Sequence, residues 1–378
     1  MSKENLEKIM DALPEEEQHR LSEQAAQPLK GKNTIPVLNP ITAKDLQEKK
    51  MPPLVWVVDD ILPVGVCVLA AKPKRGKSFF ALDLCLSVCN GFDFLGYKTH
   101  PGACLYFDIE SGQRRPKDRL EKMLKGKLAP ANLYIVTMEE LENSEHEAGK
   151  ALKIGSGFEI LLDGFLNDHQ EIKLVVIDIL ARARQGKKNK EDDYERDYRD
   201  FGELIRIANN HKVCVMCVMH NTKTEHSDPF DDIQGSAGVM GSLDTAMVIQ
   251  RTNTEDNDST LYIRGRDIEE QALVMSFDNG KWIRRGTQEE VERQQLETEY
   301  KGSPIIQTIE ALLKDQSEWK GTPKELITES IYKGTHIGYS PKKTGEEIGR
   351  FWSMLERDYL ARYLGHKTKG NTYLFKRK

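Results

Sequence analysis

The sequence predicts an α/β protein with a mainly parallel central sheet, followed by a small C-terminal domain. Between residues 51 and 285, short apolar runs alternate with helical stretches, the pattern of a parallel sheet covered on both faces. A loop containing glycine and lysine separates the first apolar run from the first helical stretch. The charge balance then changes. Residues 303–378 contain fourteen Lys and Arg against nine Asp and Glu, whereas the whole chain has a net charge of −5.

The elements of the first part follow one another in a regular order. The apolar run at 64–71 is short and β-branched, and the helix after it, at 77–91, ends at a glycine, which commonly terminates helices. Further strands are expected at 103–110, 133–138, 173–180 and 212–220, and further helices at 114–126, 158–168 and 198–210. The later runs TAMVIQR, TLYIRGR and ALVMSFD have no helices between them, so we expect an antiparallel extension at one sheet edge.

Composition divides the chain into four segments. Residues 1–50 are polar and predict an arm with a short helix near 5–10, and residues 51–285 form the α/β domain. Residues 286–302 are charged without an apolar face, which predicts a linker. Residues 303–378 predict three helices, the last of them long, and a hairpin around Gly370 and Asn371, which is a winged-helix arrangement. The basic balance of this last segment indicates contact with an anionic partner, with ordinary surface charge as the alternative.

Several classes of protein do not fit the composition. No apolar run reaches 18 residues, so we expect no membrane span, and the N-terminus lacks the apolar core of a secretory signal. The six cysteines are scattered in or near apolar runs, which predicts buried thiols rather than a disulfide framework. We therefore expect a cytoplasmic protein.

The loop after the first apolar run reads AKPKRGKS and has the form of a phosphate-binding loop. Such a loop wraps phosphate with backbone N–H groups and aims a helix N-terminus at it. Gly76 allows close approach, Lys77 can reach the β and γ phosphates, and Ser78 offers a hydroxyl to Mg²⁺. The residues expected to contact the nucleotide are Ala71, Lys72, Pro73, Lys74, Arg75, Gly76, Lys77, Ser78 and Phe79.

Two carboxylates at strand ends complete the expected chemistry. Asp178 ends the run Val-Val-Ile, the Walker B pattern, where a buried carboxylate is costly unless it binds a metal or a water on one; a helix cap is the alternative. Glu110 closes the strand that follows the phosphate-loop helix, where it can position or deprotonate a water. Asp108 is on the same strand face and is either a competing base or an ion-pair partner.

A histidine ends the next strand at the same edge. A lone histidine at a strand end is usually structural. The position of His220 after the Walker B strand, with Asn221, Thr222 and Lys223 following, nevertheless favours a γ-phosphate sensor. Cys214 and Cys217 have CxxC spacing but lie within an apolar strand, so we expect them in the core.

These residues, in this order, resemble the RecA-type ATPases, specifically the RepA-like hexameric replicative helicases of plasmids, phages and integrated elements. The resemblance covers roughly residues 52–285. Its markers are PPLVWVVDDILP, LAAKPKRGKSFFALDL, LYFDIESGQRRPKDRL, LVVIDILARAR, VMHNTK, GSAGVMGSLDTAMVIQR and LYIRGRDIEEQALVMSFD. Ala71 departs from the pattern, where a glycine is common, and so does Asn221, where a second histidine is common. The C-terminal segment looks more weakly like the winged-helix appendage of phage-borne relatives.

The resemblance implies a RecA-like core, a ring of six subunits, and ATP with Mg²⁺ bound between neighbours. It implies that Lys77 and Ser78 bind phosphate and Mg²⁺, that Asp178 is the Walker B residue and that Glu110 is the catalytic carboxylate. It also implies that His220 couples the γ-phosphate to DNA-binding loops, and that a basic residue of the adjacent subunit completes the site. Arg264 and Arg266 are the candidates for that residue, unless they are solvated on an edge strand.

The same resemblance implies single-stranded DNA as partner, with replication proteins as further candidates. Two long segments without apolar periodicity, 185–200 and 223–238, are expected to line the channel of the ring. Lys187, Lys188 and Lys190 could contact a phosphate backbone, whereas the acidic run after them argues against a tight clamp.

The leading hypothesis is an ATP-driven helicase translocating on single-stranded DNA, with mostly electrostatic, salt-sensitive contacts. The nearest alternative is a RecA-core protein for recombination, repair or loading that binds DNA in an ATP-gated way without unwinding. A small-molecule kinase is disfavoured because such kinases carry an Arg-bearing lid near the site, whereas the candidate arginines here lie on a late edge strand. A module that only binds nucleotide is disfavoured by Glu110.

Overall fold

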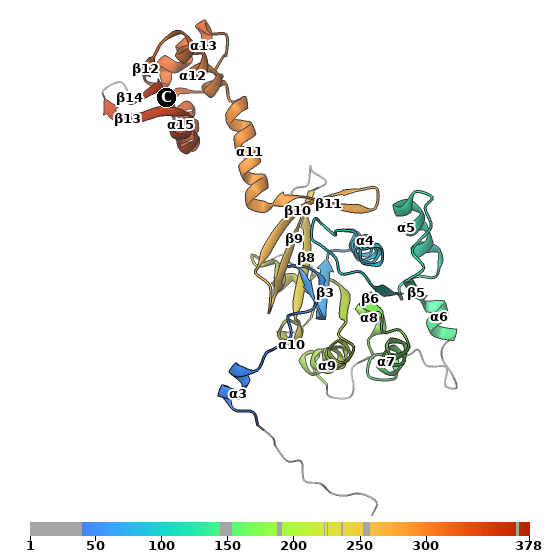
Figure 1. Ribbon diagram of the computed structural model, residues 1–378. Helices are drawn as coiled ribbons and strands as arrows, with labels where there is room; N and C mark the ends of the chain where they lie inside the picture. The colour runs from blue at the N-terminus through green and yellow to red at the C-terminus, as the bar shows by residue number, and fades with distance from the viewer. Residues whose placement is uncertain are drawn as a thin grey trace, which may run out of the picture. The chain divides into compact units, whose positions relative to one another are not determined.

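The structure is a computed structural model that describes residues 40–143, 153–186, 191–222, 224, 226–235, 237–251, 258–367 and 370–378 (Figure 1). The chain separates into two compact units, Met1–Pro53 and Leu54–Lys378. The described part of the first unit contains one short helix, α3 (Ala43–Glu48), whose N-cap Thr42 accepts a hydrogen bond from the backbone N–H of Asp45. The helix expected near residues 5–10 lies outside the described residues.

A nine-stranded sheet forms the centre of the second unit, in the order β11-β10-β9-β8-β3-β7-β6-β4-β5. The strands from β8 to β5 are parallel, and β9, β10 and β11 extend the sheet antiparallel at one edge. This arrangement confirms the predicted fold class. The strands are β3 (Gly65–Ala71), β4 (Ala103–Asp108), β5 (Leu133–Thr137), β6 (Ile172–Asp178), β7 (Cys214–His220), β8 (Thr245–Arg251), β9 (Asp258–Gly265), β10 (Gln271–Asp278) and β11 (Lys281–Thr287). A separate small hairpin, β1 (Trp56–Val58) and β2 (Leu62–Pro63), precedes them.

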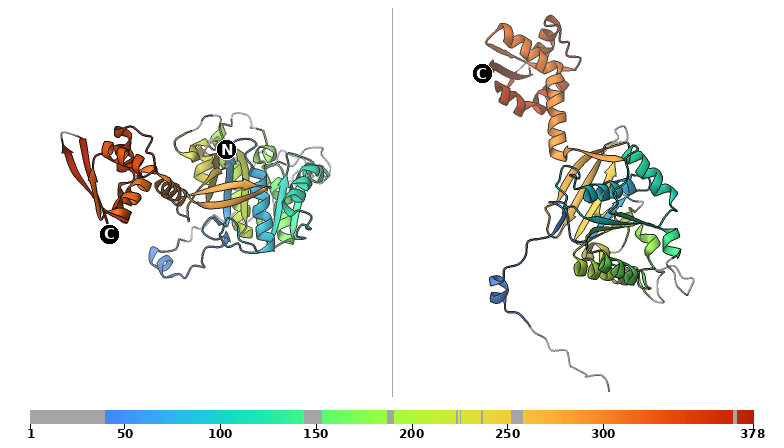
Figure 2. Two further views of the ribbon diagram at one scale, coloured as in Figure 1. Left: turned by 90° about the horizontal axis from the view of Figure 1, so that it is seen from above. Right: turned by 45° about the vertical axis from the view of Figure 1, so that its right-hand side comes forward.

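Helices cover both faces of this sheet (Figures 1 and 2). Helices α4 (Lys77–Asn90) and α5 (Arg114–Leu124) pack into one hydrophobic core, and α7 (Phe158–Asp168) and α9 (Asp193–His211) pack into the other. Every residue of β3 is therefore buried, which explains why the sequence of this strand is a continuous apolar run rather than an alternating one. Four shorter helices occur in this part: α6 (Met138–Asn143), α8 (Leu180–Ala183), η1 (Pro229–Asp232) and α10 (Ala237–Ser242).

Two expectations from composition can be compared with the structure. All six cysteines are free, and all except the half-buried Cys89 are buried, as expected for core thiols. Along the described ranges, no helix combines the length and the apolar character that a membrane crossing requires.

Helix α9 begins at Asp193, earlier than the predicted start at 198, so part of the expected channel-lining segment 185–200 is helical. A capping box starts the helix: the Asp192 side chain accepts from the Glu195 N–H, and the Glu195 side chain accepts from the Asp192 N–H. Asp197 and Asp200 are fully buried on its inner face. The acidic run is thus the first two turns of a helix, and the lysines at 187–190 lie outside the described residues.

The predicted linker at 286–302 contains the end of β11 and then helix α11 (Gln288–Gly302), which Thr287 and Glu290 begin with a second capping box. Leu296 and Tyr300 of this helix pack into a third hydrophobic core, formed by the C-terminal residues.

The C-terminal residues form four helices and a three-stranded sheet of order β12-β14-β13. The expected long third helix is two helices, divided at Phe351, and the short strand β12 was not predicted. Gly370 and Asn371, around which the hairpin turn was predicted, are instead the first residues of β14 and pair with Lys367 and His366. The elements are α12 (Pro304–Asp315), β12 (Glu318–Gly321), α13 (Pro323–Tyr332), α14 (Pro341–Arg350), α15 (Trp352–Asp358), β13 (Tyr359–Lys367) and β14 (Gly370–Arg377).

Candidate nucleotide-binding site

The loop between β3 and α4 has the backbone of a phosphate-binding loop. Gly76 is the N-cap of α4 and has a φ of 77°, in the left-handed region that favours glycine. A Cβ atom on Gly76 would come within 2.9 Å of the Trp282 ring, so the position also requires glycine for space. The N–H groups that begin α4 are therefore open to an anion beside the loop.

Lys77 is buried and folded back onto its own loop. Its Nζ donates to the carbonyl oxygens of Ala71 at 2.8 Å and Lys72 at 3.2 Å, and lies 3.2 Å from His220 Nδ1. Burial lowers the pKa of Lys77 to about 8. Ala71 and Lys72 thus contribute backbone oxygens to the lysine and do not line the cavity described below.

Asp178 ends β6 and is buried beside the loop. Its Oδ2 accepts a hydrogen bond of 2.7 Å from the hydroxyl of Tyr106 on β4, the neighbouring strand. Its Oδ1 is also buried and has no hydrogen-bond partner among the described residues. A buried, unsatisfied carboxylate oxygen fits a hydrated Mg²⁺ ion. Within the described ranges, no group of three His, Cys, Asp or Glu side chains is placed to hold a metal ion.

The two carboxyl groups at the end of β4 have different surroundings. Asp108 is buried, accepts from the Ser111 hydroxyl at 2.8 Å and forms an ion pair of 2.9 Å with Arg119. Burial raises the pKa of Asp108, partly offset by these two partners. Glu110 is exposed and lines the cavity, with no ion pair to any described residue. Of the two, Glu110 is therefore the carboxylate open to a water molecule, and Asp108 is an ion-pair partner.

His220 ends β7 and lies next to the phosphate loop. Because Lys77 donates to its Nδ1, that nitrogen acts as the acceptor and the proton is placed on Nε2. Burial and the neighbouring Lys77 charge lower the pKa of His220, which favours the neutral ring. The backbone N–H of the next residue, Asn221, donates to the Ala71 carbonyl oxygen at 3.2 Å. The ends of β3, β6 and β7 therefore bring Lys77, Asp178 and His220 together at one edge of the sheet.

These side chains surround a cavity of about 650 Å³. Seven of its lining residues were not identified from the sequence as site residues: Arg115, Arg119, Ile179, Arg251, Ser259, Phe277 and Trp282. The sequence could have identified Arg115 and Arg119, because they are four residues apart on the helix that follows Glu110 and so lie on one face of it. The cavity also contains Pro73, Lys74, Arg75, Gly76, Lys77, Ser78, Phe79, Glu110, Asp178 and His220, so cationic side chains outnumber acidic ones.

The β10–β11 hairpin closes the cavity over the phosphate loop. Trp282 Nε1 donates to the Gly76 carbonyl oxygen at 3.3 Å. The rings of Phe277 and Trp282 are 5.0 Å apart, and those of Phe79 and Phe277 are 5.5 Å apart, which makes an aromatic wall. Nothing in the local sequence of the hairpin indicates this contact, because it joins residues far apart in the chain.

Arg264 and Arg266 do not lie at this cavity. Arg264 pairs with Ala246, which is level with Val68 and so lies before the carboxyl end of β3. Its guanidinium is held by ion pairs with Asp228 and Glu270, both at 2.9 Å, and lies over the Phe230 ring.

Arg266 follows β9, where Thr245 pairs with Gly265, and donates to the Gly241 carbonyl oxygen at 2.8 Å. The chain therefore does not bring either arginine to its own phosphate loop.

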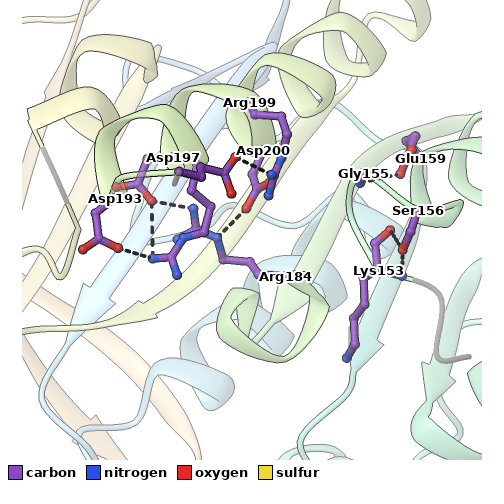
Figure 3. A network of polar contacts seen from close by, with 11 residues as sticks. Lys153, Gly155, Ser156, Glu159, Arg184, Asp193, Asp197, Arg199 and Asp200 are labelled. Atoms are coloured by element: carbon purple, nitrogen blue, oxygen red, sulfur yellow. Dashed lines mark hydrogen bonds and ion pairs between the residues drawn. The ribbon is translucent and has the colours of Figure 1, made fainter. Parts of the chain in front are cut away.

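A network of ion pairs fixes the segment that follows Asp178 (Figure 3). Arg184 pairs with the buried Asp197 and, at 2.7 Å, with the buried Asp200 of α9. Arg199 pairs with Asp200 and with Glu191. The acidic run that argued against nucleic-acid contact is thus partly neutralised inside the protein.

A phosphate loop, a strand-end Walker B carboxylate and an open glutamate on a mainly parallel sheet define a P-loop ATPase. Comparison with family models identifies the family: residues 33–226 match the AAA domain family, and the chain belongs to it.

Other comparisons give weaker likenesses. No curated protein matches the sequence. Among solved structures, the chain is similar to the ATPase domain of G40P, with 14% identity and a TM-score of 0.44 over 58% of this chain and 84% of that chain. It is also similar to a DnaB-like replicative helicase described with its interactions with primase, with 15% identity and a TM-score of 0.45. That match covers 58% of this chain and 57% of the helicase chain, so the chain spans little more than half of that protein.

Proposed function

We propose that this ATPase is a DNA motor that hydrolyses Mg²⁺-ATP and translocates on single-stranded DNA as a RepA-like replicative helicase. The observation that carries the hydrolytic part is the placement of Lys77, Asp178 and Glu110 around one cavity, where Glu110 is exposed. The DNA part rests on the sequence resemblance to RepA-like helicases and on the basic C-terminal segment.

In the proposed reaction, the cationic side chains of the cavity bind the triphosphate. Lys77 leaves the carbonyl oxygens of its loop and moves to the β and γ phosphates, which also releases His220 Nδ1. His220 is then free to respond to the γ-phosphate, as expected of a sensor. Ser78 and Asp178 would hold Mg²⁺, which supplies positive charge against the phosphates when it is bound. Glu110 orients the attacking water and accepts its proton.

The aromatic wall gives the cavity a second, less polar end. Phe79, Phe277 and Trp282 line it together with Ser259 and Arg251. Flat aromatic rings and an arginine are suited to the nucleobase, so we assign this end to adenine and the loop end to the phosphates.

We further propose that the motor moves on DNA as a ring of six copies, as the resemblance to the RepA-like family implies. In such a ring, Arg264 and Arg266 would act on the nucleotide of a neighbouring subunit. Arg264 would first have to exchange its pairs with Asp228 and Glu270. Replication proteins remain proposed partners of the assembly.

Contact with DNA is proposed at two places. One is the edge of the core where the segments after β6 and β7 meet: a Cβ on Gly235 would lie 3.5 Å from an Asp197 oxygen, so the two segments are neighbours. The other is the C-terminal winged helix, whose last residues, 357–378, carry seven basic side chains and one acidic one. Both contacts would weaken with salt.

The arginines of the cavity bear on the small-molecule kinase alternative. The sequence argument against a kinase was that the candidate arginines lie on a late edge strand, yet Arg115 and Arg119 line the cavity. An open carboxylate such as Glu110 serves either class, because it can orient an acceptor hydroxyl or a water, so the dependence of ADP formation on an added acceptor separates the two. A RecA-like protein that binds DNA under ATP control without unwinding remains the alternative within the same class.

Steady-state ATP hydrolysis with and without single-stranded DNA tests the proposal. We expect DNA to stimulate turnover, Lys77→Ala to abolish it, and Glu110→Gln to retain nucleotide while stopping turnover. ATP hydrolysis that DNA does not stimulate would contradict a DNA motor. ADP formation that requires an added acceptor molecule would indicate a kinase. Duplex unwinding by the stimulated enzyme would separate a helicase from an ATP-gated DNA-binding protein.

A further inference from the structure

Helix α5 begins four residues after Glu110 and is anchored beside it. Arg119 forms an ion pair of 2.9 Å with Asp108, and the side chains of these two residues are 19% and 2% exposed. Pro116 and Met123 of the same helix are buried. The helix is therefore fixed against the end of β4, and the residue one turn before Arg119 is fixed with it.

Arg115 is that residue, and it lines the cavity together with Lys77 and Glu110. It is exposed and has no ion pair with any residue in the described ranges. The neighbouring Arg114 differs, because it pairs with Asp118 at 3.7 Å, is 92% exposed and does not line the cavity. An unpaired guanidinium facing an anion-binding cavity is suited to bind phosphate oxygens in two-pronged fashion.

We propose that Arg115 is a catalytic residue that stabilises the γ-phosphoryl group from within the chain that binds the nucleotide. This inference rests on the ATP hydrolysis proposed above. Under this inference, the chain that binds the nucleotide itself supplies part of the charge stabilisation. The family resemblance implies that this stabilisation comes from the adjacent subunit.

The step balances as follows. The water oxygen forms a bond to the γ-phosphorus while the bond from that phosphorus to the β–γ bridging oxygen breaks, leaving ADP and inorganic phosphate. The proton of the water goes to Glu110 and from there to phosphate. Negative charge accumulates on the bridging and γ oxygens, and Arg115 donates N–H groups to the γ oxygens as that charge develops.

The placement of the other arginines supports this assignment. Arg264 is occupied by two carboxylates and the Phe230 ring, and Arg266 by Asp244 and the Gly241 carbonyl oxygen. Arg119 is committed to Asp108. Of Arg115 and Arg119, Arg115 is therefore the one whose guanidinium can move to the γ-phosphate beside Glu110.

The first test compares Arg115→Ala with Arg114→Ala in the full chain. We expect Arg115→Ala to lower kcat on the order of a hundredfold, as when one transition-state donor is removed, with KM changed only severalfold. It should also lose affinity for ADP with aluminium fluoride while it retains affinity for ADP alone. Arg115→Lys should recover part of the loss, and Arg114→Ala should match the wild type in all four measurements. An unchanged kcat in Arg115→Ala would overturn the inference.

The second test asks which chain supplies the arginine. Arg115→Ala and Lys77→Ala chains carrying different tags are co-expressed and purified through both tags. If Arg115 acts in its own chain, every site in the mixed assembly remains defective and hydrolysis is not restored. Restored hydrolysis would place Arg115 in a neighbour's site and overturn the inference. A wild-type chain without ATPase activity would instead refute the proposed function itself, and this inference with it.

Discussion

Asp83 offers a prediction whose size follows from the structure. It lies on α4, faces the β10–β11 hairpin and is 7% exposed, and the backbone N–H of Trp282 donates to its carboxylate. Burial raises the pKa of Asp83 from its ordinary value of 3.8 to about 6, against the smaller opposing effects of Lys281 and the Trp282 N–H. The folded chain therefore binds a proton at Asp83 more tightly than the unfolded chain does.

The sign of the pH dependence follows from that difference. The contribution of Asp83 to stability is fully present below pH 3.8 and is lost as the pH rises through about 6. Because one pH unit corresponds to about 1.4 kcal/mol, the ionised group disfavours the folded state by about 3 kcal/mol above pH 7. Asp83→Asn removes the titration and keeps an oxygen to accept from the Trp282 N–H.

We expect Asp83→Asn to raise the melting temperature of the ATPase core at pH 8 by several degrees, about 2–4 °C for each kcal/mol in a domain of this size. Near pH 4 the variant and the wild type should melt together. Thermal unfolding followed by circular dichroism from pH 4 to 8 measures this, with the exposed Asp93→Asn as a matched control. Equal pH dependence in Asp83→Asn and the wild type would refute the argument.

Three further predictions concern the site and the C-terminal segment. Because burial lowers the pKa of Lys77 to about 8, affinity for a fluorescent ATP analogue should fall above pH 8, up to tenfold per pH unit, and Lys77→Arg should not show this fall. Tyr106→Phe removes the hydroxyl that holds Asp178 Oδ2, so the Mg²⁺ concentration for half-maximal hydrolysis should rise severalfold; an unchanged Mg²⁺ titration would assign Tyr106 to the core alone. Deleting residues 303–378 should lower the affinity for single-stranded DNA and the salt dependence of that affinity, which fluorescence anisotropy at several salt concentrations measures. Basal ATP hydrolysis should persist in the truncated chain.

The arrangement of the phosphate loop, Glu110, Asp178 and His220 was predictable from the sequence. Each of these groups follows an apolar run, and the carboxyl ends of parallel strands meet at one edge. Their convergence therefore needed only the correct fold class and the position of each strand end. Their roles in binding and hydrolysis stay predictions until the variants are measured.

Other features depend on contacts that a linear sequence does not reveal. Residues 193–200 were expected to belong to a channel-lining segment because that segment lacks apolar periodicity, yet Arg184 and Arg199 neutralise Asp200 inside the protein and a helix forms. Arg115 belongs to a basic helix, and only the anchoring of Arg119 to Asp108 shows which of its arginines faces the cavity. The phosphate loop meets Trp282 through tertiary packing.

That last contact has a consequence for how the protein is made. The hydrogen bond from Trp282 to Gly76 joins residues 206 positions apart in the chain. A ribosome that has synthesised Lys77, Glu110, Asp178 and His220 has produced the polar groups of the site but not the wall that closes it. Nascent chains thus acquire the complete cavity only after the β10–β11 hairpin emerges, and binding of cellular ATP to that complete cavity stabilises the core only from then on.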